Sequence, residues 1–379
     1  MELRRLTADD YDQLVLLLNE VFTRHNGKKQ DFEKMLPKMC VRDDGHMGKH
    51  FGVFEETELV ACIGVYPLDG VVAGEKLRFA TMGNIATHWE HTGKGYMSKL
   101  IDVALEELRN LGVDAARLGG NRFRYNRYGF ESCGQALYFT FNPNTLAARF
   151  PDTGEIAFIK IDRQDTEALK FCCGLYNANA IAVTRDVADC YQVMTAWEHT
   201  PYLCLQAGEP VGYLCADGSG MDVAEVFGVD LGRFTDILCQ WQKQKQTAVC
   251  FALQPHMTEY IRRFSAISDV MKVQSPSHFK ICNWEKVITA FLKLKASYRV
   301  LQEGELILEI ADYGKVRIFV EGKNVGCEKT DLAPQLTLTS LEASRFLFGP
   351  LSPGDTAEAN PLAENWFPLP LSWNGQDRV

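Results

Sequence analysis

A strand, a glycine turn and a helix follow one another in the first third of the chain, and this junction constrains the fold more than any other stretch. Residues 85–87 are typical of a strand, and residues 91–95 form a glycine-rich turn. A helix then begins at Tyr96. The start of a helix leaves backbone amides unpaired, and glycine lets an anion approach them closely. We therefore expect an anion site here, built by Gly93 and Gly95 with added charge from Lys94.

Two familiar phosphate-binding motifs do not fit this turn. The dinucleotide-binding motif needs a third glycine where this chain has Ser98. A P-loop needs a glycine followed by Lys and then Ser or Thr, and that ending is absent. A tight turn that binds no ligand is the remaining alternative, because Gly-x-Gly before a helix is a weak signal alone.

A tyrosine segment further along supplies the second motif. Residues 125–130 follow the pattern Tyr-x-x-x-Gly-Phe. When an amine attacks a thioester, the expelled thiolate needs a proton. A phenol with a pKa of ~10 can protonate a thiol with a pKa of ~8.5. Tyr125 is therefore the predicted general acid, with Tyr128 as the alternative. We expect a tight backbone at Gly129 and a core position for Phe130.

Together the two motifs resemble those of the GCN5-related N-acetyltransferase (GNAT) superfamily. The resemblance implies an α+β fold with a mixed, mostly antiparallel sheet, flanking helices and acetyl-CoA as co-substrate without a metal. The superfamily signature, Arg/Gln-x-x-Gly-x-Gly/Ala, aligns best with Thr92 first, Gly95 in the middle and Met97 last. A shifted register would place Glu90 first, which we disfavour because a carboxylate there would repel phosphate.

The resemblance also implies which residues bind the substrates. The strand before the turn would bind the pantetheine arm like an added strand. The loop after the first helix would form the rim of the amine pocket, through Phe22, His25 and Asn26. The general base is left open: His88 and Glu90 lie next to the strand end, and Asn121 lies before the tyrosine segment. The predicted coenzyme-binding residues are Ile85, Ala86, Thr87, Thr92, Gly93, Lys94, Gly95, Tyr96, Met97 and Asn121.

The whole chain is similar in length and layout to the enhanced intracellular survival (Eis) acetyltransferases. That resemblance implies a catalytic GNAT domain at 1–148, a degenerate GNAT-like domain at 149–283 and a sterol-carrier-protein-like domain at 284–379. We expect the aromatic tail at 365–373 to dock on the body. In the family, the C-terminal carboxylate enters the active site and helps to deprotonate the amine; here that residue is Val379. A homo-oligomer is also implied.

The net charge and the distribution of cysteines limit which partners and which cellular compartment we expect. The 379 residues carry a net charge of −9 and twelve scattered cysteines without a CxxC pair. The negative charge argues against nucleic-acid binding and suits a cationic substrate. Scattered cysteines, no long apolar run and no signal-like N-terminus predict a cytoplasmic protein that does not enter a membrane.

These observations predict an acetyl-CoA-dependent N-acetyltransferase that acts on the primary amine of a small or peptidic cationic substrate. The alternative is a non-catalytic coenzyme-A- or lipid-binding protein with an apolar pocket in the C-terminal domain. A large apolar tunnel there, with no cleft near Tyr125, would favour the alternative.

Overall fold

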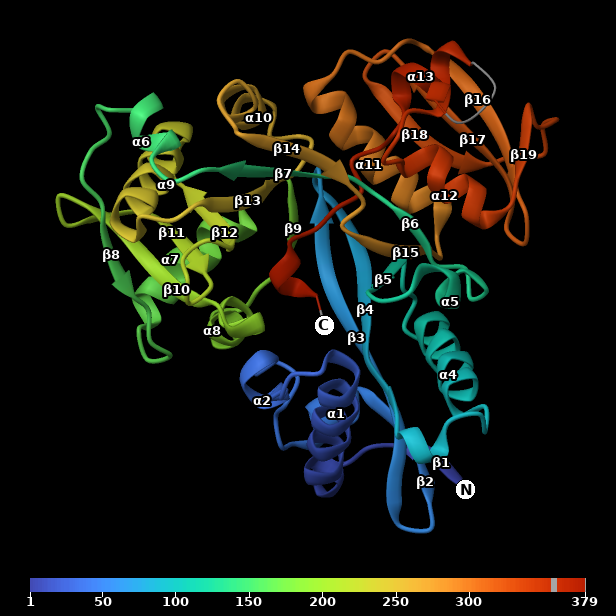
Figure 1. Ribbon diagram of the computed structural model, residues 1–379. Helices are drawn as coiled ribbons and strands as arrows, with labels where there is room; N and C mark the ends of the chain where they lie inside the picture. Colours follow the sequence, from blue (N-terminus) through green and yellow to red (C-terminus); the bar gives the residue numbers. More distant parts are fainter. Residues whose placement is uncertain (356–359, 379) are drawn as a thin grey trace.

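The computed structural model describes residues 1–355 and 360–378, and its largest sheet forms the first unit (Figure 1). The eight strands run in the order β1-β2-β3-β4-β5-β15-β6, with β9 pairing on β3 outside that order. All neighbours are antiparallel except β4 and β5. The strands are β1 Glu2–Arg5, β2 His50–Glu55, β3 Glu58–Val72, β4 Glu75–Thr87, β5 Ala115–Leu118, β6 Glu131–Cys133, β9 Ile181–Val183 and β15 Ser277–Ile281.

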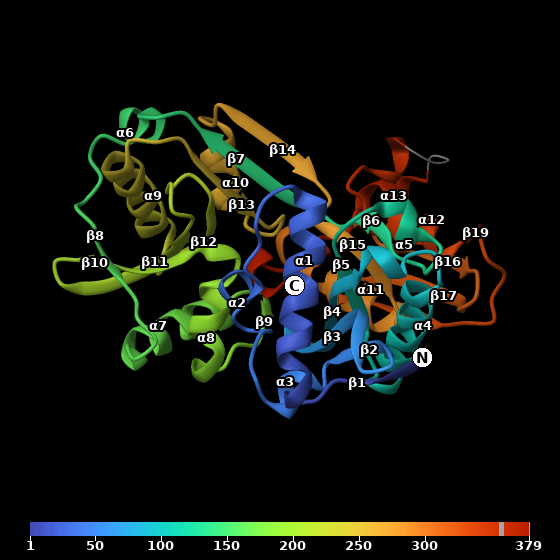
Figure 2. The ribbon, with the colours of Figure 1, turned by 60° about the horizontal axis from the view of Figure 1, so that its bottom comes forward.

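Two long helices, α1 (Tyr11–Asn26) and α4 (Tyr96–Asn110), cover opposite faces of this sheet. Successive residues of a strand point to opposite faces, so Ile63 packs with the α4 side and its neighbour Cys62 with the α1 side. Figure 2 shows α1 crossing in front of β3 and β4. The short helices of this unit are α2 Phe32–Met35, α3 Asp44–Met47 and α5 Arg122–Asn126.

The second unit holds a four-stranded sheet, β12-β11-β10-β8, and a three-stranded sheet, β13-β7-β14. Its strands are β7 Ala136–Phe141, β8 Ala157–Lys160, β10 Thr200–Gln206, β11 Glu209–Ala216, β12 Val223–Gly228, β13 Val249–Leu253 and β14 Val270–Gln274. Its helices are α6 Thr145–Arg149, α7 Thr166–Asn177, α8 Val187–Met194, α9 Leu231–Lys245 and α10 Thr258–Ser265. The second unit lies beside α1 and α2 of the first (Figures 1 and 2).

The third unit is a four-stranded sheet, β18-β17-β16-β19, with three helices. Its core is continuous with the first sheet, because Phe79 of β4 and Phe279 of β15 belong to the same buried cluster as Phe291. Its elements are α11 Trp284–Tyr298, β16 Gly304–Ile310, β17 Gly314–Glu321, β18 Asn324–Lys329, β19 Leu336–Leu338, α12 Ser340–Phe348 and α13 Pro361–Trp366.

Strand exchange joins the units across the predicted domain boundaries. β7 lies within residues 1–148 of the sequence, yet it pairs with β13 and β14 of the second unit. β15 lies within 149–283, yet it inserts between β5 and β6 of the first sheet. Sequence pattern identifies strands but not their partners when pairing joins distant segments. The α+β fold is confirmed, and the division into domains stays a prediction.

The aromatic tail docks as predicted. Trp366 and Phe367 are buried in the core shared by the first and third units. Further along, Trp373 stacks on Phe79, with ring centroids 4.5 Å apart, and packs edge-on against Phe279. The tail thus runs back from the third unit to the centre of the molecule, where its end is marked C in Figure 1.

Candidate active site

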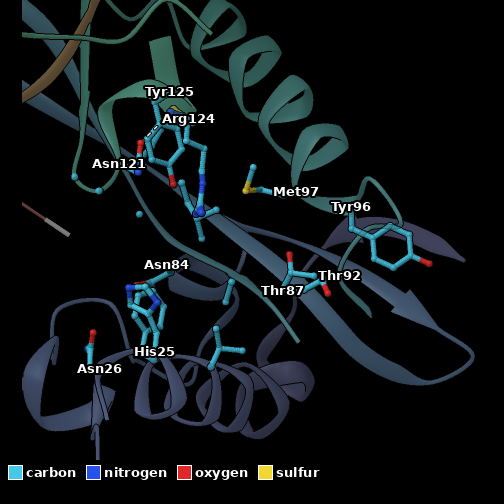
Figure 3. Close-up of a pocket in the computed structure, with 18 of the residues that line it drawn as sticks. His25, Asn26, Asn84, Thr87, Thr92, Tyr96, Met97, Asn121, Arg124 and Tyr125 are labelled. Atoms are coloured by element: carbon cyan, nitrogen blue, oxygen red, sulfur yellow. Dashed lines mark hydrogen bonds between the residues drawn. The ribbon is translucent and has the colours of Figure 1, made fainter. Parts of the chain in front are cut away.

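A cleft of about 1090 Å³ lies at the centre of the first unit, between the end of α1, the end of β4 and the start of α4. Figure 3 shows Tyr125 and Asn121 at one end of this cleft and Thr92 with Tyr96 at the other. The structure brings twelve of the sequence-predicted site residues to its lining: Phe22, His25, Asn26, Ile85, Ala86, Thr87, Thr92, Gly93, Gly95, Tyr96, Met97 and Asn121; the predicted acid, Tyr125, joins them.

Two features open the sheet at the cleft: a β-bulge in β4, and the separation of β4 from β5. Ile63 of β3 faces both Asn84 and Ile85, so β4 carries one extra residue there. β4 and β5 pair only as far as Met82 and Leu118. Beyond that point, no strand of the described chain pairs with the β5 side of β4. The edge of residues 84–87 is therefore available to an extended ligand.

The glycine turn has the conformation that its sequence predicts. Gly93 and Gly95 have φ values of 80° and 79°, which lie in the left-handed region that favours glycine. A Cβ at either position would meet no protein atom within 4 Å, so both glycines face open space. Gly95 is the N-cap of α4. The first amides of the helix therefore face the cleft and can bind an anion.

Lys94 is held away from the cleft, contrary to expectation. Its ammonium lies 2.8 Å from Glu55 Oε1, on the neighbouring strand β2, and Lys94 does not line the cleft. The hydroxyl of Tyr96 also donates a hydrogen bond to Glu55. These two contacts hold the pKa of the Glu55 carboxyl at about 2, so it stays ionised and keeps Lys94. Any pyrophosphate at the turn would therefore be bound mainly by backbone amides.

Tyr125 lies in the last turn of α5, with its side chain largely buried in the core under α4. Burial raises the pKa of its phenol, while the nearby Arg124 opposes that shift. The phenol is therefore protonated at neutral pH. The expected tight turn follows at Gly129, with φ 83°, and Phe130 is fully buried. Tyr128 does not line the cleft.

The lining also contains residues that were not predicted from the sequence, among them Asn84, Arg124 and Trp197. Asn84 occupies the bulge with φ 52° and donates a hydrogen bond of 2.7 Å to the Tyr66 hydroxyl. The Gly83-Asn84 pair within β4 was the available sequence signal for this bulge. Arg124 directly precedes Tyr125 in the sequence, so its signal was its position next to the tyrosine motif. Trp197 comes from the second unit, and no local pattern indicates that it reaches the cleft.

Val379 lies outside the described residues, but the tail before it ends close to the cleft. The guanidinium of Arg378 lies 4.7 Å from the ring centroid of Trp197. Of the residues named for the open assignment of the base, Asn121 lines the cleft, whereas His88 and Glu90 do not.

The described lining of the cleft contains no Asp or Glu. A cleft without carboxylates accepts the phosphates of a coenzyme without repulsion. Across residues 1–355 and 360–378, no three His, Cys, Asp or Glu side chains are grouped so that they could hold a metal ion. None of the helices in those residues is long and apolar enough to span a membrane.

Comparison with known proteins supports this description of the first unit. Residues 2–133 match the sequence model of the acetyltransferase (GNAT) domain. A comparison of the sequence with curated proteins finds no match.

Solved structures share the fold over nearly the whole chain at low identity. A GCN5-related N-acetyltransferase from Anabaena variabilis is 14% identical with a TM-score of 0.68, covering 98% of each chain. Eis1 from Mycobacterium abscessus is 13% identical with a TM-score of 0.67, covering 99% of this chain and 98% of its own. A GCN5-related N-acetyltransferase from Kribbella flavida is 17% identical with a TM-score of 0.61, and the match covers 91% of this chain and 89% of its own. The chain therefore contains an acetyltransferase (GNAT) domain at residues 2–133, and over nearly its whole length it shares the fold of these solved structures.

Proposed function

We propose that the chain transfers the acetyl group of acetyl-CoA to the primary amine of a small or peptidic substrate, with Tyr125 as general acid. One observation carries the proposal: Tyr125 and the open glycine turn at Gly93 and Gly95 line the same cleft. A phosphate-binding turn and a proton donor in one cavity are what thioester aminolysis requires.

The chain's own groups suit the coenzyme. The unpaired edge at residues 84–87 can bind the amides of a pantetheine arm, and the turn at Gly93 and Gly95 can bind its pyrophosphate. The coenzyme supplies the activated acetyl thioester when it is bound. Thr92, Tyr96, Met97 and Asn121 complete the proposed coenzyme site, whereas Lys94 contributes only by neutralising Glu55.

Direct attack by the amine needs one proton removed from the amine and one delivered to the departing thiolate. The buried phenol of Tyr125 holds the second proton, because its raised pKa keeps it protonated at neutral pH. For the first proton we propose the terminal carboxylate of Val379, as the resemblance to the Eis family implies. The placement of Arg378 beside Trp197, a residue that lines the cleft, supports this assignment.

The acceptor amine is proposed to enter past Phe22, His25 and Asn26, which lie at the end of α1. The cationic character predicted for the acceptor rests on the net charge of −9 alone. The described lining of the cleft does not add support, since it offers His25 and Arg124 but no carboxylate.

For the rest of the chain we propose a degenerate GNAT-like second domain and a sterol-carrier-protein-like third domain that serve structure, in a homo-oligomer. The interior of the third unit is filled by buried side chains such as Phe291, Phe346 and Leu347. A filled interior, together with a cleft at Tyr125, favours catalysis over the alternative of a lipid- or coenzyme-binding protein.

An amine panel assayed with acetyl-CoA tests the proposal. The release of free thiol is followed with amino acids, peptides, polyamines and amino sugars as acceptors. Amine-dependent thiol release supports acetyl transfer. Binding of coenzyme A without thiol release for any amine would favour the binding protein instead.

A further inference from the structure

A second, smaller cavity adjoins the proposed active site at its Tyr125 end. We name it the side cavity; its volume is about 470 Å³. It shares Gly119, Gly120 and Trp197 with the cleft. A Cβ on Gly120 would lie 3.1 Å from the ring of Tyr125, so the shared wall touches the proposed acid. The glycine turn lies at the opposite end of the cleft (Figure 3). The side cavity is therefore on the acceptor side of Tyr125.

The charge of the side cavity is positive. Arg117 and Arg378 both line it, and its described lining contains no Asp or Glu. The nearest acidic residue of the tail, Asp377, directs its carboxylate to Arg185 and Tyr176 instead. An anion that entered the side cavity would meet two guanidinium groups and no like charge from the described residues.

Arg117 is almost fully buried, and no carboxylate of residues 1–355 and 360–378 forms a hydrogen bond or ion pair with it. Its Nη2 donates to the carbonyl of Asn374 at 3.1 Å, and its Nη1 lies 3.4 Å from the carbonyl of Trp373. Its Nε is buried and has no hydrogen-bond partner in the part of the chain that the structure describes. Burial lowers the pKa of Arg117 to about 9, while the negative charge of nearby Asp377 opposes that shift.

Two further buried nitrogens of the side cavity have no hydrogen-bond partner among the described residues. They are Nε1 of Trp197 and Nδ1 of His278, whose other ring nitrogen lies 2.8 Å from the carbonyl of Gly120. Indole Nε1 and guanidinium Nε can only donate a hydrogen bond, so both need an acceptor atom. Trp197 also has a left-handed backbone, with φ 61°, followed by Glu198 at 60°. Such strain persists where the surroundings hold a side chain in a required position.

We propose that the side cavity binds the carboxylate of an acceptor whose primary amine lies in the cleft beside Tyr125. The acceptor class is then amino acids or short peptides that carry an amine and a carboxylate at a distance, rather than polyamines. Arg117, Arg378 and Trp197 determine this specificity by donating to the carboxylate. The inference rests on the proposed function, because it describes the acceptor of that same reaction.

Matched pairs of acceptors test the inference: ω-amino acids such as β-alanine and γ-aminobutyrate, each compared with its carboxamide. The two members of a pair share the amine and the chain length, and differ only in the charge at the far end. Charge-assisted hydrogen bonds to a carboxylate predict kcat/KM about ten- to a hundredfold higher for the acid at the best chain length. Equal or higher kcat/KM for the carboxamide at every chain length would overturn the inference and leave acetyl transfer intact.

Two variants assign the effect to the side cavity. Arg117→Gln and Arg378→Gln should each bring the acid-to-amide ratio of kcat/KM close to one. Arg149→Gln removes the same charge from an exposed site and should keep the ratio. A loss of rate that is equal for acid and amide would indicate a structural role only. Arg378 is exposed, so its variant remains informative if Arg117→Gln does not fold.

A binding measurement separates failure of the inference from failure of the proposed function. The same pairs are titrated into the full-length protein with coenzyme A by calorimetry, which needs no turnover. Tighter binding of the acid supports the side cavity even if no amine is acetylated. Preference for the acid that arises only after residues are appended beyond Val379 would mean that the chain's own carboxylate occupies the side cavity, and would overturn the inference.

Discussion

Arg185 and Asp377 form a buried ion pair in which Nε of the arginine donates to Oδ1 of the aspartate at 3.0 Å. Arg185 also donates to Glu225 Oε2 at 3.0 Å, and the Tyr176 hydroxyl donates to Asp377 Oδ2 at 2.6 Å. Since Arg185 and Glu225 belong to the second unit, this cluster fixes the end of the chain at the junction beside the cleft.

Asp377→Ala should therefore destabilise the protein strongly. The change removes one partner from a buried charge cluster and leaves Arg185 with a single carboxylate. The expected loss in the free energy of unfolding is ~3–5 kcal/mol, measured by denaturant unfolding. Glu167→Ala is the matched control, because its pair with Lys170 is exposed; it should cost less than ~1 kcal/mol. Equal losses for the two variants would show that the cluster does not hold the tail.

Lys38 should make the stability depend on pH above neutrality. It is buried against the carbonyl of Gln376, and desolvation lowers its pKa from 10.5 to about 7. Between pH 7 and 10.5 the unfolded chain binds this proton and the folded chain does not. The contribution of Lys38 to the free energy of unfolding therefore rises with pH across this window. The destabilisation caused by burying its charged ammonium is greatest below pH 7.

Lys38→Met isolates that contribution, because other titrating groups cancel when the variant is compared with the wild type. The stability advantage of the variant should be largest below pH 7 and should shrink as the pH rises towards 10, at up to ~1.36 kcal/mol per pH unit. Urea unfolding at several pH values measures it. A difference that is independent of pH would mean that Lys38 titrates normally in the folded protein.

Gly95→Ala should weaken coenzyme binding. The residue has φ 79° and lines the cleft, so the methyl group adds backbone strain of ~1–2 kcal/mol and occupies space above the helix amides. We expect the KM for acetyl-CoA to rise on the order of tenfold, which corresponds to ~1.4 kcal/mol.

Gly112→Ala is the control for strain. Gly112 also has a positive φ, 61°, and open space around its Cβ position, but it follows α4 far from the cleft lining. Its variant should lose similar stability and keep the wild-type KM. A KM that rises equally in both variants would remove the glycine turn from coenzyme binding.

Appending two glycines after Val379 tests the proposed base. The extension displaces the terminal carboxylate but keeps Asp377 and its buried contacts, which deletion of residues 377–379 would destroy. The expected result is a fall in kcat of about tenfold or more with unchanged thermal stability. The same two residues placed before the exposed Met1 should have no effect. Wild-type kcat in the C-terminal extension would reject the carboxylate as base.

The sequence predicted those parts of the site that depend on short stretches of chain. Gly93, Gly95 and Tyr125 fall within local motifs, so their conformations and their place in the cleft follow from residues close to them. Lys94 does not line the cleft, contrary to the prediction, because its ammonium pairs with Glu55 of another strand, β2. Arg117 and Trp197 were missed for a related reason: their roles depend on the tail and on the second unit, which reach the cleft only through tertiary packing.

The same reasoning applies to the fold. The sequence predicted the α+β class through its resemblance to the GNAT superfamily, and the docked tail through the aromatic composition of residues 365–373. It did not predict that β7 leaves the first sheet or that β15 enters it, because many strands with similar patterns can pair in either way.

Tyr125→Phe is the most direct test of the account. Removing the hydroxyl should lower kcat by about a hundredfold or more, since no other donor is assigned to the departing thiolate. Acetyl-CoA affinity, measured by calorimetry, should stay within about twofold of wild type, because the glycine turn and the β4 edge are unchanged. Tyr128→Phe, outside the cleft lining, should keep wild-type kcat. Wild-type turnover in Tyr125→Phe, or loss of turnover in Tyr128→Phe alone, would contradict the account.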